Sequence, residues 1–255
     1  MSKEIKIGLI GAGWMGKAHT TAFHNARMIF GDDMPVFELV SDVSEDAVAK
    51  FAKNMGYNRY TTNWMDVVTD PEIDLVDVAT PNCMHYEMAK AALEHGKHVF
   101  CEKPLSLSAE QSRELADLAK KKGVVNYCGF SNIMNPANQY VAELVKSGKL
   151  GKIVGIQSNY AIAKPHEYFD VEWHTKKGSG PLLINAIHDF DDLNFVTGMK
   201  PTKVYAAARN TIRGNEVEDS VSAVVEYEGG VTASYFVSAW TDSICRWRNM
   251  LYHSS

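Results

Sequence analysis

Residues 5–16 read IKIGLIGAGWMG, and this stretch decides the fold of the first part of the chain. The run IKIGLI is short, mostly apolar and rich in β-branched residues, which predicts a buried strand. A glycine-rich turn follows it, and the residues from there to Arg27 have the spacing of a helix. The stretch is therefore predicted to fold as a strand, a tight turn and the start of a helix.

The turn fits the pattern Gly-x-Gly-x-x-Gly at Gly11, Gly13 and Gly16. In a dinucleotide-binding fold the first glycine allows the tight turn, the second lets the backbone approach a pyrophosphate, and the third lets helix and strand pack closely. Free N–H groups at the start of the helix would bind the phosphates. The alternative is a glycine-rich turn without a ligand. A Walker-type phosphate loop is excluded because Ala18 stands where Ser or Thr would be needed.

Predicted strands and helices alternate through the rest of the first half of the chain. The predicted strands are residues 36–42, 75–79, 98–101 and 124–128, and the predicted helices are residues 45–55, 87–94 and 108–122. Alternation at this length predicts a doubly wound parallel sheet with right-handed crossovers. We assign residues 1–128 to a Rossmann domain that binds a dinucleotide.

The second half of the chain has longer predicted strands that alternate in period two, which is typical of an antiparallel sheet with one covered and one open face. Gly229 and Gly230 separate the last two strands and predict a two-residue hairpin. A helix over residues 183–197, closed by Gly198, is expected to cover one face. We assign residues 129–255 to an α+β domain with an open, mainly antiparallel sheet, whose free face suits a homo-oligomer contact.

Composition narrows the classes of ligand. The chain has 255 residues, of which 45% are hydrophobic, and a formal net charge of −5. A chain of this length buries a core without a disulfide or a structural metal. Its four cysteines form no Cys-x-x-Cys pair, so no disulfide framework and no metal site are expected. There is no long basic block for nucleic acid, and no apolar run for a signal peptide or membrane span. We expect a cytoplasmic protein with a small-molecule ligand.

Asp42 ends the second predicted strand. A carboxylate at this position can accept hydrogen bonds from ribose hydroxyls and would repel a 2′-phosphate. This favours NAD, with NADP as the alternative cofactor. The other interpretation is that Asp42 only caps the turn that follows.

The carboxyl ends of the next two predicted strands form the edge at which open α/β sheets bind ligands. The residues expected at this edge are Thr80, Pro81, Asn82, His85, Glu102 and Lys103. Pro104 biases Lys103 away from helical angles, which leaves a lysine beside a glutamate at the mouth of the crevice. The alternatives are that Lys103 is a solvated surface charge and that His85 only begins a helix. This edge is predicted to bind the cofactor together with Gly11, Gly13, Trp14, Met15, Gly16 and Asp42.

Four stretches of the chain are similar to those of one family. They are GAGWMG at 11–16, ATPNCMH at 79–85, GKHVFCEKPL at 96–105 and GSGPLLINAIHDFD at 178–191. Together they resemble the Gfo/Idh/MocA oxidoreductases, which include glucose-fructose oxidoreductase and the inositol dehydrogenases. The resemblance implies a Rossmann domain followed by an α/β domain with an open sheet, NAD(P) as cofactor, and sugars, cyclitols or their derivatives as substrates. By position, the family's Glu-Lys-Pro lysine is Lys103 and its distal histidine is His188.

Alcohol oxidation gives both of these residues a chemical role. The hydroxyl proton must be removed while hydride leaves carbon for the nicotinamide, and a neutral histidine can take that proton. We predict that His188 is this general base. A cationic Lys103 would hold the hydroxyl oxygen and stabilise the developing alkoxide, and relay of the proton is its alternative role.

Further residues are expected to bind the substrate. On a helix, Asn185, Asp191 and Asp192 share the face of His188 and offer polar partners for it and for polyol hydroxyls. The predicted substrate-binding residues are Lys103, Trp173, His174, Asn185, His188 and Asp191. For Trp173 and His174 the alternative is a packing or surface role.

Two features depart from the family pattern. Many members carry an aspartate four residues before the histidine, where this chain has Ile184, and Asn185 or Asp191 is expected to replace it. Members of the family also continue for several strands and a helix where this chain reads TDSICRWRNMLYHSS over residues 241–255, so it is expected to be C-terminally truncated.

The sequence thus predicts an NAD(P)-dependent dehydrogenase that oxidises a secondary hydroxyl of a cyclitol, sugar or sugar derivative. One alternative is a dinucleotide-binding protein that truncation has made inactive. The other is an enzyme that uses tightly bound NAD for epimerisation or elimination without net redox.

Overall fold

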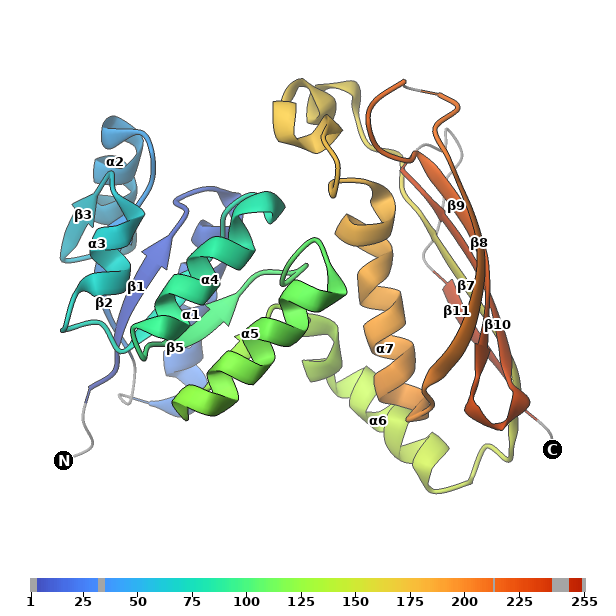
Figure 1. Cartoon of the computed structure of the whole chain (residues 1–255). Helices are drawn as coiled ribbons and strands as arrows, with labels where there is room; N and C mark the ends of the chain where they lie inside the picture. Colours follow the sequence, from blue (N-terminus) through green and yellow to red (C-terminus); the bar gives the residue numbers. More distant parts are fainter. Residues whose placement is uncertain (1–3, 32–34, 213, 240–247, 254–255) are drawn as a thin grey trace. The chain divides into compact units, whose positions relative to one another are not determined.

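The computed structural model describes residues 4–31, 35–212, 214–239 and 248–253. The chain divides into two compact units, unit 1 over residues 1–129 and unit 2 over residues 130–255 (Figure 1). Within the described ranges, no helix has the length and apolar character needed to cross a bilayer.

Unit 1 is a parallel sheet of six strands in the order β3-β2-β1-β4-β5-β6, which is the strand order of the Rossmann fold. Its strands are β1 Lys6–Ile10, β2 Val36–Ser41, β3 Arg59–Thr61, β4 Leu75–Val78, β5 His98–Cys101 and β6 Asn126–Cys128. Its helices are α1 Trp14–Phe30, α2 Glu45–Met55, α3 Trp64–Thr69, α4 His85–Glu94 and α5 Ala109–Lys122, with a short 3-10 turn η1 at Asn82–Met84. The predicted doubly wound parallel fold is confirmed.

The two faces of this sheet bury separate cores because successive strand residues point to opposite sides. Leu9 packs with Val40 and Val48 in the core that α2 covers. The next residue, Ile10, joins the core that includes Met88 of α4 and the helix α5. The carboxyl ends of the strands are therefore held between two packed layers, which fixes the loops that follow them.

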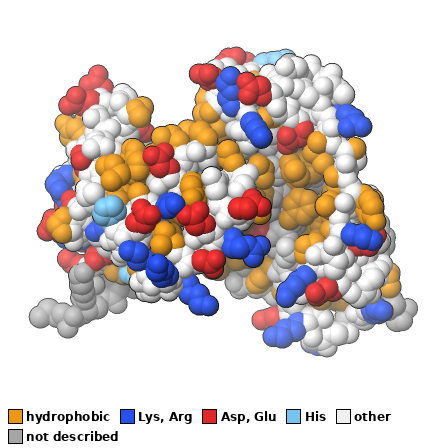
Figure 2. All heavy atoms as spheres, viewed as in Figure 1, with side chains coloured by type: hydrophobic (Ala, Val, Ile, Leu, Met, Phe, Trp, Pro, Cys, Tyr) orange, Lys and Arg blue, Asp and Glu red, His pale blue; other side chains and the backbone are white. Residues whose placement is uncertain are grey.

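The outer surface of α4 and α5 mixes acidic and basic side chains (Figure 2). Lys90 and Glu114 form an ion pair there, with 2.6 Å between Nζ and Oε1. Charges of both signs interspersed in this way create no large field of one sign.

Unit 2 is a five-stranded sheet in the order β11-β7-β10-β9-β8, in which β7 and β10 are parallel and the other pairs antiparallel. The strands are β7 Ile153–Ala161, β8 Pro201–Arg209, β9 Ser220–Tyr227, β10 Thr232–Ser238 and β11 Arg248–His253. The helices are α6 Pro136–Lys146 and α7 Ile187–Thr197, and the short turns are η2 Ser131–Met134, η3 His166–Asp170, η4 Glu172–Thr175, η5 Leu182–Ala186 and η6 Glu228–Gly230. The predicted open, mainly antiparallel sheet is confirmed.

Helix α7 covers one face of this sheet (Figure 1). Its Leu193 is buried with Ile156, Val225 and Tyr235 from three strands. On β9 and β10 the alternate residues point away from this core, and among them Phe236 is 41% exposed. The open face is thus partly apolar.

Two details of the second unit differ from the expectations or fall outside them. The strands β9 and β10 are joined by residues 228–231 rather than by two glycines alone, although Gly229 and Gly230 both have positive φ angles, 81° and 82°. Of the C-terminal stretch 241–255, residues 248–253 pair as β11 with β7. Residues 240–247, with Cys245, and residues 254–255 lie outside the described residues.

Candidate cofactor and substrate sites

The three glycines of the turn between β1 and α1 have different surroundings. Gly11 has a φ of 105°, and a Cβ at this position would lie 2.5 Å from the carbonyl oxygen of Ala79. A Cβ at Gly16 would lie 2.1 Å from the carbonyl oxygen of Gly11. At Gly13, by contrast, no heavy atom of any described residue other than Gly13 itself and its two neighbours in the chain lies within 4 Å of such a Cβ. Two glycines thus allow close packing, and the third leaves open space.

This arrangement fits a dinucleotide. The open space lies over the backbone of Gly13, and helix α1 begins directly after it at Trp14, with no acidic side chain in its first turn. The free N–H groups and the positive end of a helix dipole favour an anion at this place. Met15 and Gly16 continue that first turn. The residues present therefore suit a pyrophosphate.

Asp42 lies at the end of β2 and binds the glycine-rich turn. Its Oδ2 accepts a hydrogen bond of 2.8 Å from the N–H of Ala12. The cap of the following helix is Ser44, whose hydroxyl accepts from the N–H of Ala47. The carboxylate of Asp42 is therefore held beside the turn rather than used as the cap of α2.

His85 is fully buried at the start of α4, and it connects two strand-end loops. Its Nδ1 lies 2.7 Å from the carbonyl oxygen of Pro104, and its Nε2 lies 2.8 Å from the carbonyl oxygen of Thr80. Asn82 in the same loop is also buried, while Thr80 and Pro81 are half-buried. Both ring nitrogens of His85 are thus engaged by backbone, so any effect of this residue on a cofactor would act through the two loops.

Lys103 follows Glu102 directly after β5. The carboxylate of Glu102 accepts a hydrogen bond of 3.1 Å from the backbone N–H of Lys103 through Oε2. Burial lowers the pKa of the Lys103 ammonium, and the charge of Glu102 acts in the opposite direction. A lysine in this setting can bind an oxygen as a cation and can also exchange a proton.

Two buried residues of unit 1, His19 and Asp77, were not predicted from the sequence. His19 of α1 lies between Asp77 of β4 and Glu102, with one ring nitrogen bonded to each carboxylate. The signal that could have revealed them is Asp77 itself, an acidic residue inside the apolar strand LVDV. Acidic side chains are rarely buried without a partner, so this position required one.

In unit 2, His188 lies near the start of α7. Its ring meets the ring of Phe130 edge-on, with 5.9 Å between the centroids. Two residues after Phe130, Asn132 donates a hydrogen bond of 2.9 Å from Nδ2 to Oδ2 of Asp192 on α7. The stretch 130–136, which carries no cation, thus packs its side chains onto α7.

The polar residues around His188 include buried atoms without partners. Asn185 is 5% exposed, and Asp191 is half-buried. Within the part of the chain that the structure describes, Nδ2 of Asn185, Oδ2 of Asp191 and Oδ1 of Asp192 have no hydrogen-bond partner. Burial raises the pKa of both aspartates. Buried polar atoms without partners cost free energy, so these three atoms mark a place where a polar ligand would stabilise the protein.

Trp173 and His174 lie on the separate turn η4. The ring of His174 stacks on Tyr168 with 3.8 Å between centroids, and its Nδ1 lies 2.5 Å from the carbonyl oxygen of Tyr168. Trp173 meets the His174 ring edge-on, and Lys164 places Nζ 4.8 Å from the centre of the Tyr168 ring. Burial lowers the pKa of His174. The turn is thus an aromatic surface and not part of α7.

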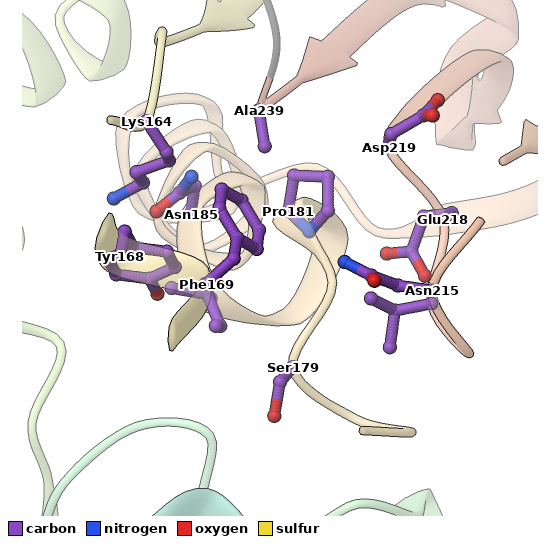
Figure 3. Close-up of a pocket in the computed structure, with 12 residues that line it drawn as sticks. Lys164, Tyr168, Phe169, Ser179, Pro181, Asn185, Asn215, Glu218, Asp219 and Ala239 are labelled. Carbon is purple, nitrogen blue, oxygen red and sulfur yellow. The ribbon is translucent and has the colours of Figure 1, made fainter. Parts of the chain in front are cut away.

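A small cavity lies beside this turn within unit 2. Figure 3 shows the rings of Tyr168 and Phe169 with Lys164 and Asn185 beside them, and Glu218 on the other side of Pro181. The cavity has a volume of about 20 Å³, which is enough for about one water molecule. It therefore has no room for a sugar as it stands.

The structure thus brings the predicted residues together in two groups. In unit 1, the glycine-rich turn, Asp42 and the loops after β4 and β5 line one edge of the sheet. In unit 2, Asn185, His188 and Asp191 lie on consecutive turns of η5 and α7, while Trp173 and His174 lie on η4.

Comparison with known proteins extends over nearly the whole chain. Residues 5–130 match a family described as "Oxidoreductase family, NAD-binding Rossmann fold", and residues 138–248 match the "GFO/IDH/MocA C-terminal domain". Levoglucosan dehydrogenase of Pseudarthrobacter phenanthrenivorans is 30% identical over 91% of this chain and 67% of that protein. Myo-inositol 2-dehydrogenase of Thermotoga maritima is 30% identical over 79% of this chain and 58% of that protein.

Solved structures give the same result. A levoglucosan dehydrogenase in complex with NADH and L-sorbose superposes with a TM-score of 0.91 at 27% identity, over 98% of this chain and 71% of that chain. The chain therefore spans 58–71% of the length of these relatives. It belongs to the GFO/IDH/MocA family and is an NAD-dependent oxidoreductase with a Rossmann cofactor domain.

Proposed function

We propose that this protein oxidises a secondary hydroxyl of a sugar or cyclitol and transfers the hydride to NAD. The observation that carries the substrate class is the set of buried polar atoms without partners on η5 and α7, in Asn185, Asp191 and Asp192. They include one donor and two acceptors, and a hydroxyl both donates and accepts hydrogen bonds. A hydroxyl can therefore partner either kind of atom. The names of the relatives, levoglucosan and myo-inositol dehydrogenases, support the same class.

The cofactor is assigned to the edge of the sheet in unit 1. The backbone at Gly13 and the start of α1 would bind its pyrophosphate, and Asp42 would accept hydrogen bonds from its ribose. When bound there, NAD supplies the hydride acceptor. The carboxylate of Asp42 disfavours the additional phosphate of NADP, which supports NAD as the preferred cofactor.

Two side chains are assigned to the chemical step. His188 takes the proton of the substrate hydroxyl on an imidazole nitrogen, as general base. Lys103 binds the hydroxyl oxygen through Nζ and stabilises the negative charge that develops on it. Because burial lowers its pKa, Lys103 is also suited to pass on the proton, and this is its alternative role.

A turnover assay tests the proposal. The purified chain is incubated with NAD⁺ and a panel of inositols, aldoses and anhydrosugars, and NADH formation is followed. We expect activity with at least one polyol, and a loss of about 100-fold or more in kcat for Lys103→Met and His188→Gln, with NAD affinity within about tenfold of wild type. His95→Gln is the matched control, since the exposed His95 contacts, among the described residues, the carbonyl oxygen of Ala91 in its own helix and no candidate site residue. Binding of NAD without NADH formation from any polyol would contradict a dehydrogenase.

A further inference from the structure

Three ionisable side chains form a continuous buried chain in unit 1. His19 comes from α1, Asp77 from β4, and Glu102 from the loop after β5. Nδ1 of His19 lies 3.0 and 3.1 Å from the two carboxylate oxygens of Asp77, and Nε2 lies 3.1 Å from Oε1 of Glu102. The three residues are 8%, 1% and 7% exposed. This cluster connects the helix of the glycine-rich turn to the loop that carries Lys103.

The His19 ring carries a positive charge in this arrangement. An ionised carboxylate only accepts hydrogen bonds, so a ring that bonds an ionised carboxylate through each nitrogen carries both N–H protons. Burial raises the pKa of Asp77, although the hydrogen bond and charge of His19 act in the opposite direction. Burial acts to lower the pKa of His19, but the hydrogen bonds to Asp77 and Glu102 outweigh it and raise the pKa to about 10. The ring also stacks on Phe100, with 4.7 Å between centroids, which holds its plane.

Glu102 connects His19 to Lys103. One of its carboxylate oxygens bonds the ring, and the other accepts the backbone N–H of Lys103 at 3.1 Å. Burial acts to raise the pKa of Glu102, and the bond and charge of His19 outweigh it and keep this pKa low. A Cβ at Gly129 would lie 2.6 Å from Oε1 of Glu102, so the chain after β6 closes over the same carboxylate.

The other ionisable groups near the cluster are few among the described residues. Cys101 interacts electrostatically with both carboxylates, and Cys128 does so with Cys101 and Lys103. Tyr57 lies across from Asp77, and its hydroxyl is 3.2 Å from that of Thr20. Burial raises the pKa of Cys101 and of Tyr57, so both are neutral at physiological pH. Of the three residues of the cluster, Glu102 is the one whose charge acts directly on Lys103.

We propose that His19 is a positioning residue for Lys103: held by Asp77, its charged ring fixes the Glu102 carboxylate and through it the protonation of the Lys103 ammonium. His19 contacts neither substrate nor cofactor in this role. The proposal rests on the proposed function for its catalytic consequence, because Lys103 is the residue that binds the reacting oxygen there. Its physical content, the coupling of His19 to Lys103 through Glu102, is independent of turnover.

The test is an NMR titration of Lys103 in the full chain without ligand. The ¹³Cε resonance of Lys103, assigned through Lys103→Arg, gives the midpoint of its titration in wild type, His19→Asn, Glu102→Gln and the double variant. His24→Asn is the matched control, because His24 lies on the same helix, is exposed, and contacts Phe37 and the carbonyl oxygen of Met55 rather than the residues of the cluster. If His19→Asn fails to fold, His19→Gln, which keeps a donor toward Glu102, replaces it.

We expect His19→Asn to move the Lys103 midpoint by about one pH unit, as loss of a nearby charge does. In the Glu102→Gln background the same substitution should move it by less than about a third of that, because the connecting carboxylate is gone. His24→Asn should leave it in place.

An unchanged Lys103 midpoint in the folded His19→Asn protein would overturn the proposal and leave His19 a purely structural residue. So would an equal displacement in the Glu102→Gln background, because the coupling would then bypass Glu102. Absence of dehydrogenase turnover in the wild type would refute the proposed function but not this coupling, which the titration measures without NAD or substrate.

Discussion

Gly13→Ala should weaken NAD binding while leaving the fold intact. A methyl group at this position lies more than 4 Å from every described residue other than Gly13 itself and its two neighbours in the chain, so it fits there without displacing other side chains. It fills the open space that we assign to the pyrophosphate. We expect NAD affinity to fall at least tenfold, which corresponds to about 1.4 kcal/mol. The free energy of unfolding should stay within about 0.5 kcal/mol of wild type.

Gly16→Ala is the matched variant, because there the same methyl group meets protein. Its Cβ would lie 2.1 Å from the carbonyl oxygen of Gly11, where contacts under 3.0 Å are essentially never found. Overpacking of this kind costs about 1–3 kcal/mol, and the better helix propensity of alanine returns about 1 kcal/mol. The net loss of up to about 2 kcal/mol lowers the Tm of a chain of this length by up to about 8 °C.

Calorimetric titration with NAD⁺ and thermal unfolding without ligand separate the two effects. Gly13→Ala should lose affinity at unchanged Tm, and Gly16→Ala should lose Tm. A Gly13→Ala protein that binds NAD⁺ as tightly as wild type would refute the assignment of this space to the cofactor.

Four further outcomes are expected. Asp42→Ala should lower the ratio of NAD to NADP affinity by about tenfold, since no carboxylate then repels the 2′-phosphate; an unchanged calorimetric ratio would show that Asp42 only holds the turn. Because burial lowers the pKa of Lys103, turnover should begin to fall at a pH below 10.5, the pKa of a free lysine. A pH–rate profile that shows no such fall at alkaline pH would contradict a cationic Lys103. The pKa of His19 is about 10 in the folded state and 6.5 in the unfolded state. The loss of unfolding free energy in His19→Asn should therefore be largest below pH 6.5 and shrink toward pH 10. A loss that is independent of pH in urea titrations would exclude the charged ring. Phe236→Glu on the open sheet face should abolish self-association in light scattering, and an unchanged mass for an oligomeric wild type would place the contact elsewhere.

The parts of the fold that could be predicted are those with strong local signals. The strand and glycine-rich turn at 5–16 follow from spacing alone, and Ser108 and Gly123 cap α5 as its sequence pattern indicates. Among the described helices and strands, four were not predicted, β3 Arg59–Thr61, α3 Trp64–Thr69, α6 Pro136–Lys146 and β11 Arg248–His253. The first two are too short to show a periodicity. Helix α6 has no buried residue.

Some residues of the candidate site could likewise be predicted from the sequence and others could not. The glycines could be named because their spacing between one strand and one helix carries the information, and Asp42 because it ends the strand that follows. The contacts of His19 could not, because its partners Asp77 and Glu102 lie 58 and 83 positions away in the sequence. Nor could the burial of His85 between the carbonyl oxygens of Pro104 and Thr80, which depends on how two loops pack. His19 and Asp77 come together with Glu102, which contacts Lys103, only in the folded structure.

The most direct test of the central assignment is a calorimetric titration of the 255-residue chain with NAD⁺, followed in the same cell by inositols and sugars. We expect that NAD⁺ binds, that NADP⁺ binds more weakly, and that at least one polyol binds to the NAD⁺ complex. No binding of either nucleotide would contradict the assignment of the glycine-rich edge of unit 1 to a dinucleotide.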